Sequence, residues 1–346
     1  MTLLGEIHEQ PEAAARFLDR QLESVRGIAE AVRRRDPKFV LIAARGSSDH
    51  AAIYAQYVLG IRNGLPVALA APSMFSLFGA PPRIADALVI GISQSGESPD
   101  IIAVLDEARR QGAPSIAITN APGSPLASAA DHVVALEAGP ELAVAATKTY
   151  TTELLAIAAL SAALASGREA TEVRHELQGV PLALARALES DPAVQATVGG
   201  LRRTERAIVI GRGFEYATAR EVALKIQELA QVMAHAWSSS DFEHGPLALL
   251  EPGFPLIAIV SDDVAGVPLL PLLRRVRNDL GADLVVISGR DDAAEFSPIP
   301  AAHGLPAWLA PIDSIVAGQL LAYHLARARG LDTERPRSIS KVTLTR

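Results

Sequence analysis

Leu88-Val89-Ile90-Gly91-Ile92 runs directly into Ser93-Gln94-Ser95-Gly96-Glu97-Ser98. The apolar run is typical of a buried parallel strand, and three hydroxyls and a glycine follow where that strand should end. Pro99 suits a first helical turn, and residues 100–110 place four apolar side chains on one helical face: Ile101, Val104, Leu105 and Ala108. Backbone N–H groups at the start of this helix and the serine hydroxyls together predict a small anion-binding cradle. The alternative is a serine-rich turn that merely caps its helix.

The bulk composition bounds the class of protein. With 346 residues, 49% of them hydrophobic, the chain is long enough to fill two cores. The net charge of −7, with Lys and Arg scattered along the chain, argues against a general nucleic-acid binder. The absence of cysteine excludes disulfides, thiolate zinc sites and cysteine nucleophiles, and it fits a reducing compartment.

Three further observations bear on location and metal content. Residues 1–12 carry three glutamates and no apolar core, so we expect no secretory signal and a cytoplasmic protein. The longest apolar stretch, residues 154–165, is shorter than the roughly 20 residues that span a bilayer, so we expect a buried helix and no membrane partner. The eight histidines are dispersed without metal-ligand spacing, so we predict no catalytic metal.

A weak internal repeat relates the two halves of the chain. Residues 39–44 precede Arg45-Gly46-Ser47-Ser48 just as residues 207–210 precede Gly211-Arg212-Gly213-Phe214, and further apolar runs recur at the same offset. Strands that alternate with helices of about a dozen residues indicate βαβ units. The predicted fold class is therefore α/β, with two doubly wound parallel-sheet α/β sandwiches whose ligands bind beyond the carboxyl ends of the strands.

This organisation divides the chain into five expected parts. They are an N-terminal helical segment (1–30), a first sandwich (31–167), a helical linker interrupted at two prolines (168–204), a second sandwich (205–330) and a C-terminal tail (331–346). Gly211-Arg212-Gly213 opens like a dinucleotide fingerprint, but Tyr216 stands where a third glycine is needed. We therefore expect no nicotinamide cofactor, and the chain has no Walker lysine motif.

Five motifs occur in order and are specific in combination. They are the serine stretch at 93–98, Val144-Ala145-Ala146-Thr147-Lys148, Ala223-Leu224-Lys225-Ile226-Gln227-Glu228, Glu243-His244-Gly245-Pro246, and a tail from Pro336-Arg337 to Ser340-Lys341. With them the chain resembles the tandem sugar isomerase (SIS) domain proteins, and most closely the isomerase half of the glucosamine-6-phosphate synthases (glutamine–fructose-6-phosphate transaminases). The resemblance extends over nearly all of the chain and implies a C-terminal tail that folds over the active site.

The chain also departs from the synthases. Their glutaminase domain begins with a cysteine that releases ammonia from glutamine, whereas this chain starts at the isomerase half and has no cysteine, so we expect no such reaction. Arg45, Ala146 and Gln227 stand where the synthases usually carry cysteine, serine and lysine. The sugar that this chain binds can therefore differ from theirs.

The resemblance implies a set of binding residues. The sugar phosphate would be held by Gly46, Ser47, Ser48, Ser93, Gln94, Ser95 and Ser98. Val144 and Ala145 would line the sugar through backbone contacts, Ser340 would contribute from the tail, and Thr147 and Lys148 are expected to begin the next helix. No cofactor is implied.

Glu228 is the predicted proton shuttle between C1 and C2 of the sugar. Lys225 and Glu228 both lie on a helix expected over residues 215–231, with Lys225 one turn before Glu228, so the two share one face and the ammonium can keep the carboxylate ionised. The alternative is an ordinary surface ion pair. Glu221, one turn earlier, belongs to the same network or is solvated.

His244 lies in a polar loop expected over residues 238–246, and it could pass a proton as the sugar ring opens. The alternative is a solvated loop histidine. The resemblance implies a homodimer in which His244 reaches the active site of the neighbouring subunit. Trp237 and Phe242 would suit such an interface, because exposing them on a monomer is costly, although they could also pack beneath the loop.

Lys341 completes the predicted catalytic set of Glu228, His244, Lys341 and Lys225. In the resembled family the tail lysine forms a Schiff base with the ketose carbonyl or assists ring opening. The alternative is a frayed tail.

These residues predict an enzyme, an amino-sugar-phosphate isomerase and deaminase that converts glucosamine 6-phosphate to fructose 6-phosphate and ammonia. One rival is a deglycase of phosphorylated fructosyl-amines, in which Arg45 faces the carboxylate of an amino-acid moiety. Another is a non-catalytic sugar-phosphate-binding regulatory protein, which would have no need of Glu228, His244 and Lys341 together.

Overall fold

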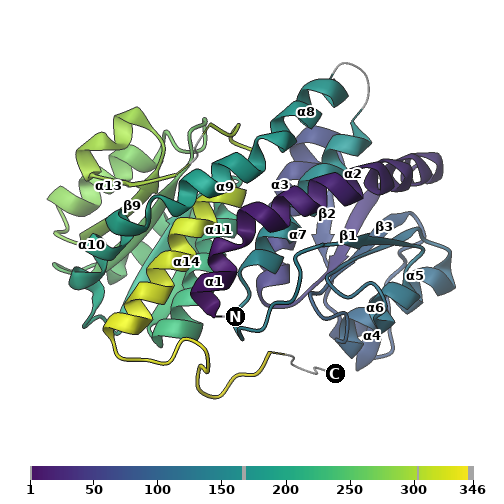
Figure 1. The fold of residues 1–346 in the computed structure, drawn as a ribbon, viewed down its shortest axis with the longest axis horizontal. Coiled ribbons are helices and arrows are strands. Elements are labelled where there is room, and N and C mark those ends of the chain that lie inside the picture. Colours follow the sequence, from purple (N-terminus) through teal and green to yellow (C-terminus); the bar gives the residue numbers. More distant parts are fainter. Residues whose placement is uncertain (1, 166–168, 302–303, 342–346) are drawn as a thin grey trace. The chain divides into compact units, whose positions relative to one another are not determined.

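The computed structural model describes residues 2–165, 169–301 and 304–341, and the chain divides into two compact units (Figure 1). The first-sheet unit comprises residues 12–141, 148–178 and the tail from Ser340. The second-sheet unit comprises residues 1–11, 142–147 and 179–339. Each unit therefore contains segments that are far apart in the sequence. The domain boundaries expected from the sequence stay predictions.

The first-sheet unit is built on a five-stranded parallel sheet. In pairing order its strands are β2 (Val67–Leu69), β1 (Phe39–Ala43), β3 (Ala87–Ile92), β4 (Ser115–Thr119) and β5 (His132–Ala135). All six residues of β3 are buried, which requires protein on both faces of the sheet. The apolar run of residues 88–92 is thus part of a buried parallel strand inside the sheet, as predicted.

Helices cover this sheet because each parallel crossover needs one. They are α2 (Gln10–Arg35), α3 (Ser47–Asn63), α4 (Ser73–Ser76), α5 (Pro99–Gln111), α6 (Pro125–Ala129), α7 (Lys148–Leu164) and α8 (Glu169–Gln178). The predicted apolar face of α5 is confirmed: Ile101, Val104, Leu105 and Ala108 pack in one buried cluster with Leu41 and Val89. The apolar stretch of residues 154–165 lies almost wholly in α7, which is buried along nearly all its length.

The second sheet repeats the order of the first. In pairing order its strands are β10 (Ile299–Pro300), β9 (Asp283–Ser288), β8 (Pro255–Val260), β6 (Arg206–Gly211) and β7 (Met233–Ser238), and all pairs are parallel. Numbered from its own first strand, each sheet reads 2-1-3-4-5. The internal repeat and the doubly wound α/β fold class inferred from the sequence are confirmed.

Two helices of the second-sheet unit begin at prolines that interrupt the predicted linker. The helices of this unit are α1 (Leu3–His8), α9 (Val180–Leu188), α10 (Asp191–Leu201), α11 (Glu215–Lys225), α12 (Ser239–Glu243), α13 (Leu269–Asn278) and α14 (Ala310–Ala328). Pro181 and Pro192 lie in the first turns of α9 and α10, where a missing N–H leaves no hydrogen bond unmade. The predicted interruptions of the linker are therefore real helix starts.

Two local expectations were wrong. The single helix expected over residues 215–231 is α-helical only to Lys225, and residues 226–230 form a π-helical turn that ends at Gln231 in a left-handed conformation. The loop expected over residues 238–246 begins with the short helix α12. Five-residue departures of this kind leave the apolar spacing almost unchanged, so the sequence does not distinguish them.

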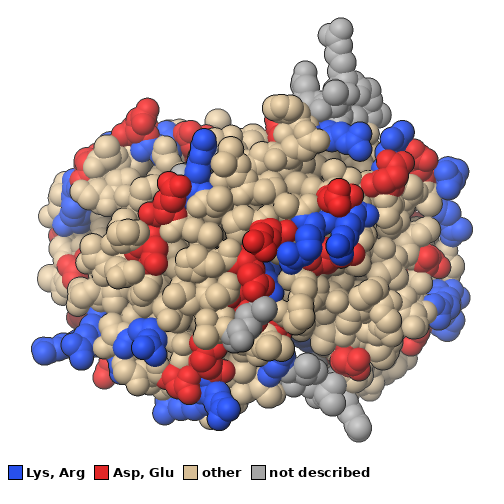
Figure 2. Space-filling view, viewed as in Figure 1, with Lys and Arg blue, Asp and Glu red and all other residues tan. Residues whose placement is uncertain are grey.

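Two surface properties complete the description. On the face shown in Figure 2, acidic and basic side chains are interspersed, in keeping with a net charge of −7. Within the described ranges, no helix combines the length and apolar character needed to cross a bilayer.

Helix α1 is fixed within its unit by residues from the end of the chain. The carboxylate of Glu334 accepts hydrogen bonds from the Leu3 N–H at 3.0 and 3.2 Å. Just after α1, Gln10, the first residue of α2, donates from Nε2 to Gln319 Oε1 of α14 at 2.9 Å. The first residues of the chain thus complete a unit that is built largely from its second half.

A buried carboxylate joins α11 to α14. Ser314 Oγ donates to the two carboxylate oxygens of Glu215 at 3.0 and 2.9 Å, and Thr218 Oγ1 donates to Oε2 at 2.5 Å. Burial raises the pKa of Glu215 to about 7, the nearby Asp313 and Asp263 charges add to the rise, and the two hydroxyl donors oppose it. The folded protein therefore keeps a proton on Glu215 that the unfolded chain loses near pH 4.5.

The stability of the protein should fall as the pH rises from about 4.5 to about 7 through this group. In that window the unfolded state binds fewer protons than the folded state. Above the window the loss in the free energy of unfolding is complete, on the order of 3 kcal/mol. Glu215→Gln cannot ionise, so it should gain stability relative to the wild type as the pH is raised from 5 to 8. Urea titrations at several pH values measure this, with the exposed Glu23→Gln as control. A difference between Glu215→Gln and wild type that stays constant with pH would contradict the assignment.

Candidate functional site

The serine stretch forms a turn between the end of β3 and the start of α5. Ser93 Oγ accepts a hydrogen bond from the Gly96 N–H at 3.1 Å, and Ser95 Oγ accepts one from the Glu97 N–H at 3.3 Å. Ser98 is the residue that precedes α5, but its side chain makes no capping hydrogen bond. Across the described part of the chain, the hydroxyls of Ser93, Ser95 and Ser98 donate no hydrogen bond to protein. Their donors are therefore available to an anion at the helix start.

Gly96 fixes the shape of this cradle. Its φ is +67°, and a Cβ at this position would lie 2.0 Å from Ser124 Oγ, so only glycine fits. The turn is also tied to the end of β4, because Thr119 Oγ1 donates to the Gln94 carbonyl at 3.3 Å and the Asn120 N–H donates to it at 3.2 Å. The carbonyl of Gln94 thus has two donors within the protein, and the hydroxyl donors of the serine stretch remain unused in the described residues.

The second predicted turn, Gly46-Ser47-Ser48, starts helix α3 at the end of β1. Gly46 has a φ of +55°. Ser48 is buried, and its Oγ donates to Glu153 Oε1 of α7 at 2.8 Å, so this hydroxyl already has a partner. Ser47 is half-buried and, within the described residues, its hydroxyl has none. Of the two hydroxyls, that of Ser47 is the available donor.

Arg45 binds the start of the cradle helix. Its Nε lies 2.9 Å and its terminal nitrogen 2.7 Å from Oδ2 of Asp100, a buried carboxylate in the first turn of α5. Asp100 Oδ1 accepts the Ile101 N–H at 3.0 Å. Half of the Arg45 side chain remains exposed, so the guanidinium lies at the surface beside the turns that end β1 and β3.

Lys225 and Glu228 are in direct contact in the second-sheet unit. Lys225 Nζ lies 2.6 Å from Glu228 Oε2 and 3.3 Å from Glu221 Oε1, and Lys225 and Glu221 are both buried. Burial opposes the charge on Lys225, but the two carboxylates outweigh it and raise its pKa above the usual value. The Glu228 side chain keeps 23% of its surface exposed. The arrangement is thus a buried ammonium that holds an accessible carboxylate, and the alternative of a surface ion pair is wrong.

His244 directly follows α12 and has an exposed side chain. Within the described ranges its imidazole makes no hydrogen bond or ion pair with Lys225, Glu228 or any other residue, and only its backbone N–H is bonded, to the Asp241 carbonyl at 3.1 Å. Phe242 is fully buried in the core of its own unit, and Trp237 packs against that core. The expectation that these aromatics form a subunit interface is therefore wrong for Phe242, because its side chain is already fully buried within its own unit.

A residue that the sequence argument missed, Glu141, holds Lys341. Lys341 Nζ lies 2.6 Å from Glu141 Oε2, and the Glu141 carboxylate is buried. Glu141 also accepts the Thr149 N–H at 3.1 Å and the Thr149 hydroxyl at 2.8 Å. The tail is thus ordered as far as Lys341 by a buried acid, and the prediction of a tail over the active site extends into residues 342–346, which lie outside the described residues.

The segment that contains Val144 and Ala145 is held by the first helix of the chain. The buried carboxylate of Glu6 accepts the Leu142 N–H at 2.5 Å and the Ala143 N–H at 3.2 and 3.3 Å. Val144 is half-buried and Ala145 buried, and α7 begins at Lys148 as expected. Ser340 is exposed beside Lys341.

The predicted residues therefore form separate groups within each unit. The first-sheet unit holds the serine cradle with Arg45 and Asp100, and Lys341 with Glu141. The second-sheet unit holds Lys225 with Glu228, the exposed His244, and the segment of Val144 and Ala145. In the described parts of the chain, no cluster of three or more acidic or histidine side chains is arranged to hold a metal ion.

Comparisons with known proteins match this architecture. The model of the SIS domain matches residues 35–163 and 200–294. The glutamine–fructose-6-phosphate aminotransferase (isomerizing) of Streptococcus pneumoniae R6 is 34% identical over 98% of this chain, and the chain spans 58% of that relative's length. A Silicibacter pomeroyi protein provisionally assigned as a phosphosugar isomerase superposes with a TM-score of 0.88 at 36% identity, covering 96% of this chain and 100% of its own. The C-terminal domain of the Francisella tularensis glucosamine–fructose-6-phosphate aminotransferase superposes with a TM-score of 0.87 at 28% sequence identity. The match covers 96% of this chain and 98% of that domain's chain.

Replacing Gly96 should damage the cradle in a way that a matched glycine does not. Gly96→Ala and Gly112→Ala each place a Cβ on a residue with positive φ, on either side of α5, and this backbone strain alone should cost each variant about 1 kcal/mol of stability. Only at Gly96 does the new Cβ collide with another residue, so only Gly96→Ala should weaken binding of a hexose 6-phosphate, by roughly tenfold or more. Calorimetric titration of both variants measures this, and equal affinities would refute the cradle.

Proposed function

Since the chain belongs to the SIS domain family, we propose that it is an isomerising amino-sugar-phosphate deaminase, which converts glucosamine 6-phosphate to fructose 6-phosphate and ammonia. The observation that carries the proposal is the buried Lys225 ammonium, 2.6 Å from the accessible carboxylate of Glu228. A phosphate-binding sensor needs donors for its ligand, but it does not need an ionised base held in this way. The cradle hydroxyls, free within the described residues, would anchor the phosphate.

The names of the relatives support the class of reaction. The S. pneumoniae relative is named for amino transfer to fructose 6-phosphate with isomerisation. This chain corresponds to about 58% of that protein. We therefore propose the same sugar interconversion in the direction that needs only water as a second reactant.

The proposed reaction begins with ring opening, which exposes the aldehyde at C1 beside the amine on C2. Glu228 removes the C2 proton, giving a 1,2-enaminol, and returns a proton to C1, which leaves an imine at C2 and a hydroxyl at C1. Water adds to the imine carbon, ammonia leaves, and the ketone of fructose 6-phosphate remains. Lys225 stays protonated throughout, and its charge favours the ionised form of Glu228 that removes the C2 proton, whereas the protonated form returns a proton to C1.

His244 and Lys341 take the remaining proton transfers. His244 has an exposed ring that is free within the described residues, so it can pass a proton to the ring oxygen as the sugar opens. Lys341, paired with Glu141 at 2.6 Å, is an ammonium that can donate to the carbonyl oxygen of the open chain. A Schiff base on Lys341 would first require transfer of its proton to Glu141.

A deglycase of phosphorylated fructosyl-amines remains the second candidate, because half of the Arg45 side chain is exposed beside the cradle. Its charge is balanced by Asp100, which weakens its attraction for the carboxylate of a substrate. Incubation of the purified protein with glucosamine 6-phosphate and with a fructosyl-amino-acid 6-phosphate separates the two reactions. Ammonia from the first supports the deaminase, and a free amino acid from the second with no ammonia from the first replaces it by the deglycase.

Glu228→Gln should abolish exchange of the C2 proton with deuterated water while leaving the affinity for the sugar phosphate within a few-fold of wild type, because the amide keeps the shape and removes the base. Nuclear magnetic resonance of the sugar in deuterated buffer measures the exchange. Glu251→Gln, which breaks an exposed ion pair with Arg206 in the same unit, is the control and should exchange normally. Exchange by Glu228→Gln within a few-fold of wild type would exclude Glu228 as the base. If the wild-type protein binds the sugar phosphate but does not exchange the C2 proton, only the function of a non-catalytic sensor would remain.

We further propose that the active form is a homodimer in which His244 serves the site of the neighbouring subunit, since its exposed ring finds no partner among the described residues of its own chain. His244→Ala and Glu228→Gln chains should each be inactive alone. After mixing and exchange of subunits, a heterodimer holds one site with both lesions and one with neither, so it should recover roughly half of the wild-type activity. No recovery after proven exchange would place both residues in one chain's site.

A further inference from the structure

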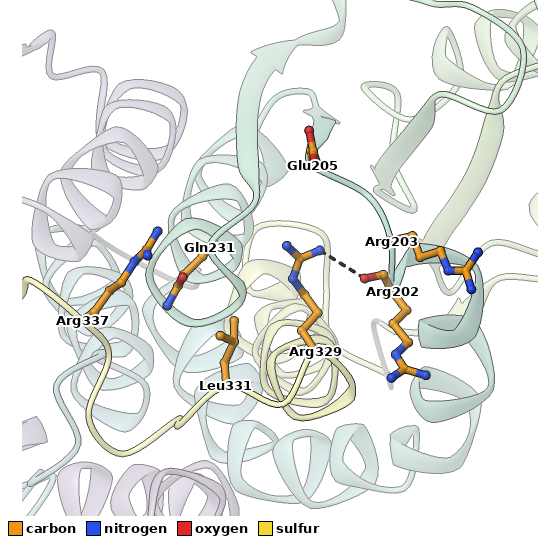
Figure 3. A pocket seen from close by; sticks show the side chains of 7 residues that line it. All are labelled: Arg202, Arg203, Glu205, Gln231, Arg329, Leu331 and Arg337. Carbon is orange, nitrogen blue, oxygen red and sulfur yellow. Dashed lines mark hydrogen bonds between the residues drawn. The ribbon is translucent and has the colours of Figure 1, made fainter.

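A groove lined by four arginines opens in the second-sheet unit. Its lining is Arg202, Arg203, Glu205, Gln231, Arg329, Leu331 and Arg337, and it encloses about 610 Å³. Figure 3 shows Arg329 between two sides, with Arg202 and Arg203 on one and Gln231 and Arg337 on the other. The groove lies where β6 and β7 begin, because Arg206 and Met233 are the first residues of those strands. This is the edge of the sheet opposite the one where α/β folds usually hold their ligands.

Three of the four guanidinium groups in this groove have no partner among the described residues. Among the residues that the structure describes, Arg202, Arg203 and Arg337 make no side-chain hydrogen bond or ion pair, and Glu205 does not pair with any of the four arginines. The groove therefore carries four positive charges and one negative charge, in a chain whose net charge is −7. Like charges brought together without counter-charges cost free energy, and this cost is relieved when an anion binds.

Neutralisation of helix ends explains only one of these arginines. Three helices end at the groove, since Arg202, Gln231 and Arg329 are the residues that cap α10, the π-helical turn and α14. Arg329 donates to the carbonyls of Arg202 and Thr204 at 3.1 and 2.6 Å, which is the expected capping interaction. The other three guanidiniums are outside that network. Helix capping therefore does not explain why these three guanidiniums lie together.

We propose that this groove binds a small polyanion that carries two or more phosphate groups. One phosphate monoester, with a charge of about −2, would leave part of the charge unmatched, and the volume is in the range of sites for whole small molecules. Guanidinium groups bind phosphate in a bidentate way, and the Gln231 amide and the Glu205 carboxylate can bind the polar body of such a ligand.

The groove touches both segments that carry predicted catalytic residues. Gln231 closes the π-helical turn that contains Glu228, and Arg337 lies in the same short tail as Lys341. A polyanion held by Arg337 and Arg203 bridges the tail to the end of α10. The site is therefore suited to regulation by ordering the tail, and its occupancy can be measured without any catalytic assay.

Titration calorimetry with inorganic tripolyphosphate tests the site directly. The wild type should bind one tripolyphosphate per chain, and Arg203→Ser/Arg337→Ser should weaken binding by roughly a hundredfold, about tenfold for each charged hydrogen-bonding group lost. The control is Arg83→Ser/Arg174→Ser, which removes the same charge from exposed positions outside the groove and should bind within about twofold of wild type. Gly96→Ala, which disrupts the serine cradle, should retain wild-type affinity.

Hydrogen exchange locates the ligand independently of affinity. Tripolyphosphate should slow amide exchange in residues 201–206 and 329–339 of the wild type and leave both segments unchanged in Arg203→Ser/Arg337→Ser. No binding by the wild type, equal affinity in the groove variant, or protection confined to residues 93–98 with loss of binding in Gly96→Ala would each overturn the proposal. The last outcome would assign the polyanion to the serine cradle.

Discussion

In a parallel sheet all strands run in the same direction, so the chain leaves every strand at the same edge of the sheet. It returns to the opposite edge through a crossover connection. This constraint assembles the cradle from segments that are distant in sequence. Arg45 follows β1, the serine stretch follows β3 and Thr119 ends β4, and hydrogen bonds join all three turns through Asp100 and the Gln94 carbonyl. The donors of the cradle are consequently fixed in place before any ligand arrives, so binding requires little ordering of the protein.

The parts that sequence reasoning predicted well are those with a local physical cause. The fully apolar β3, the one-sided apolar spacing of α5 and the repeat of strand and helix each follow from which side chains must leave water. The contact between Lys225 and Glu228 was predictable for the same reason, because one helical turn brings them together. The burial of Lys225 was not, since it depends on what packs over the helix.

The remaining features depend on partners that local patterns do not specify. Glu141 meets Lys341 across 200 positions of sequence, and no spacing rule connects them. Phe242 stands in a polar stretch, so its burial became evident only with the strands that cover it. The π-helical turn before Gln231 changes the hydrogen-bond register over five residues without changing which side chains are apolar. Only the packed structure supplies these three facts.

The position of α1 bears on how the chain folds as it is made. This helix precedes both sheets in the sequence, but its hydrogen-bond partners include Leu142 and Glu334, and Glu334 follows every strand of the second sheet. The first-sheet unit has all five strands once residue 135 has left the ribosome, so it can fold early. The opening helix must meanwhile wait unpacked, with its apolar residues Leu3 and Ile7 in water, until the second sheet exists to receive it.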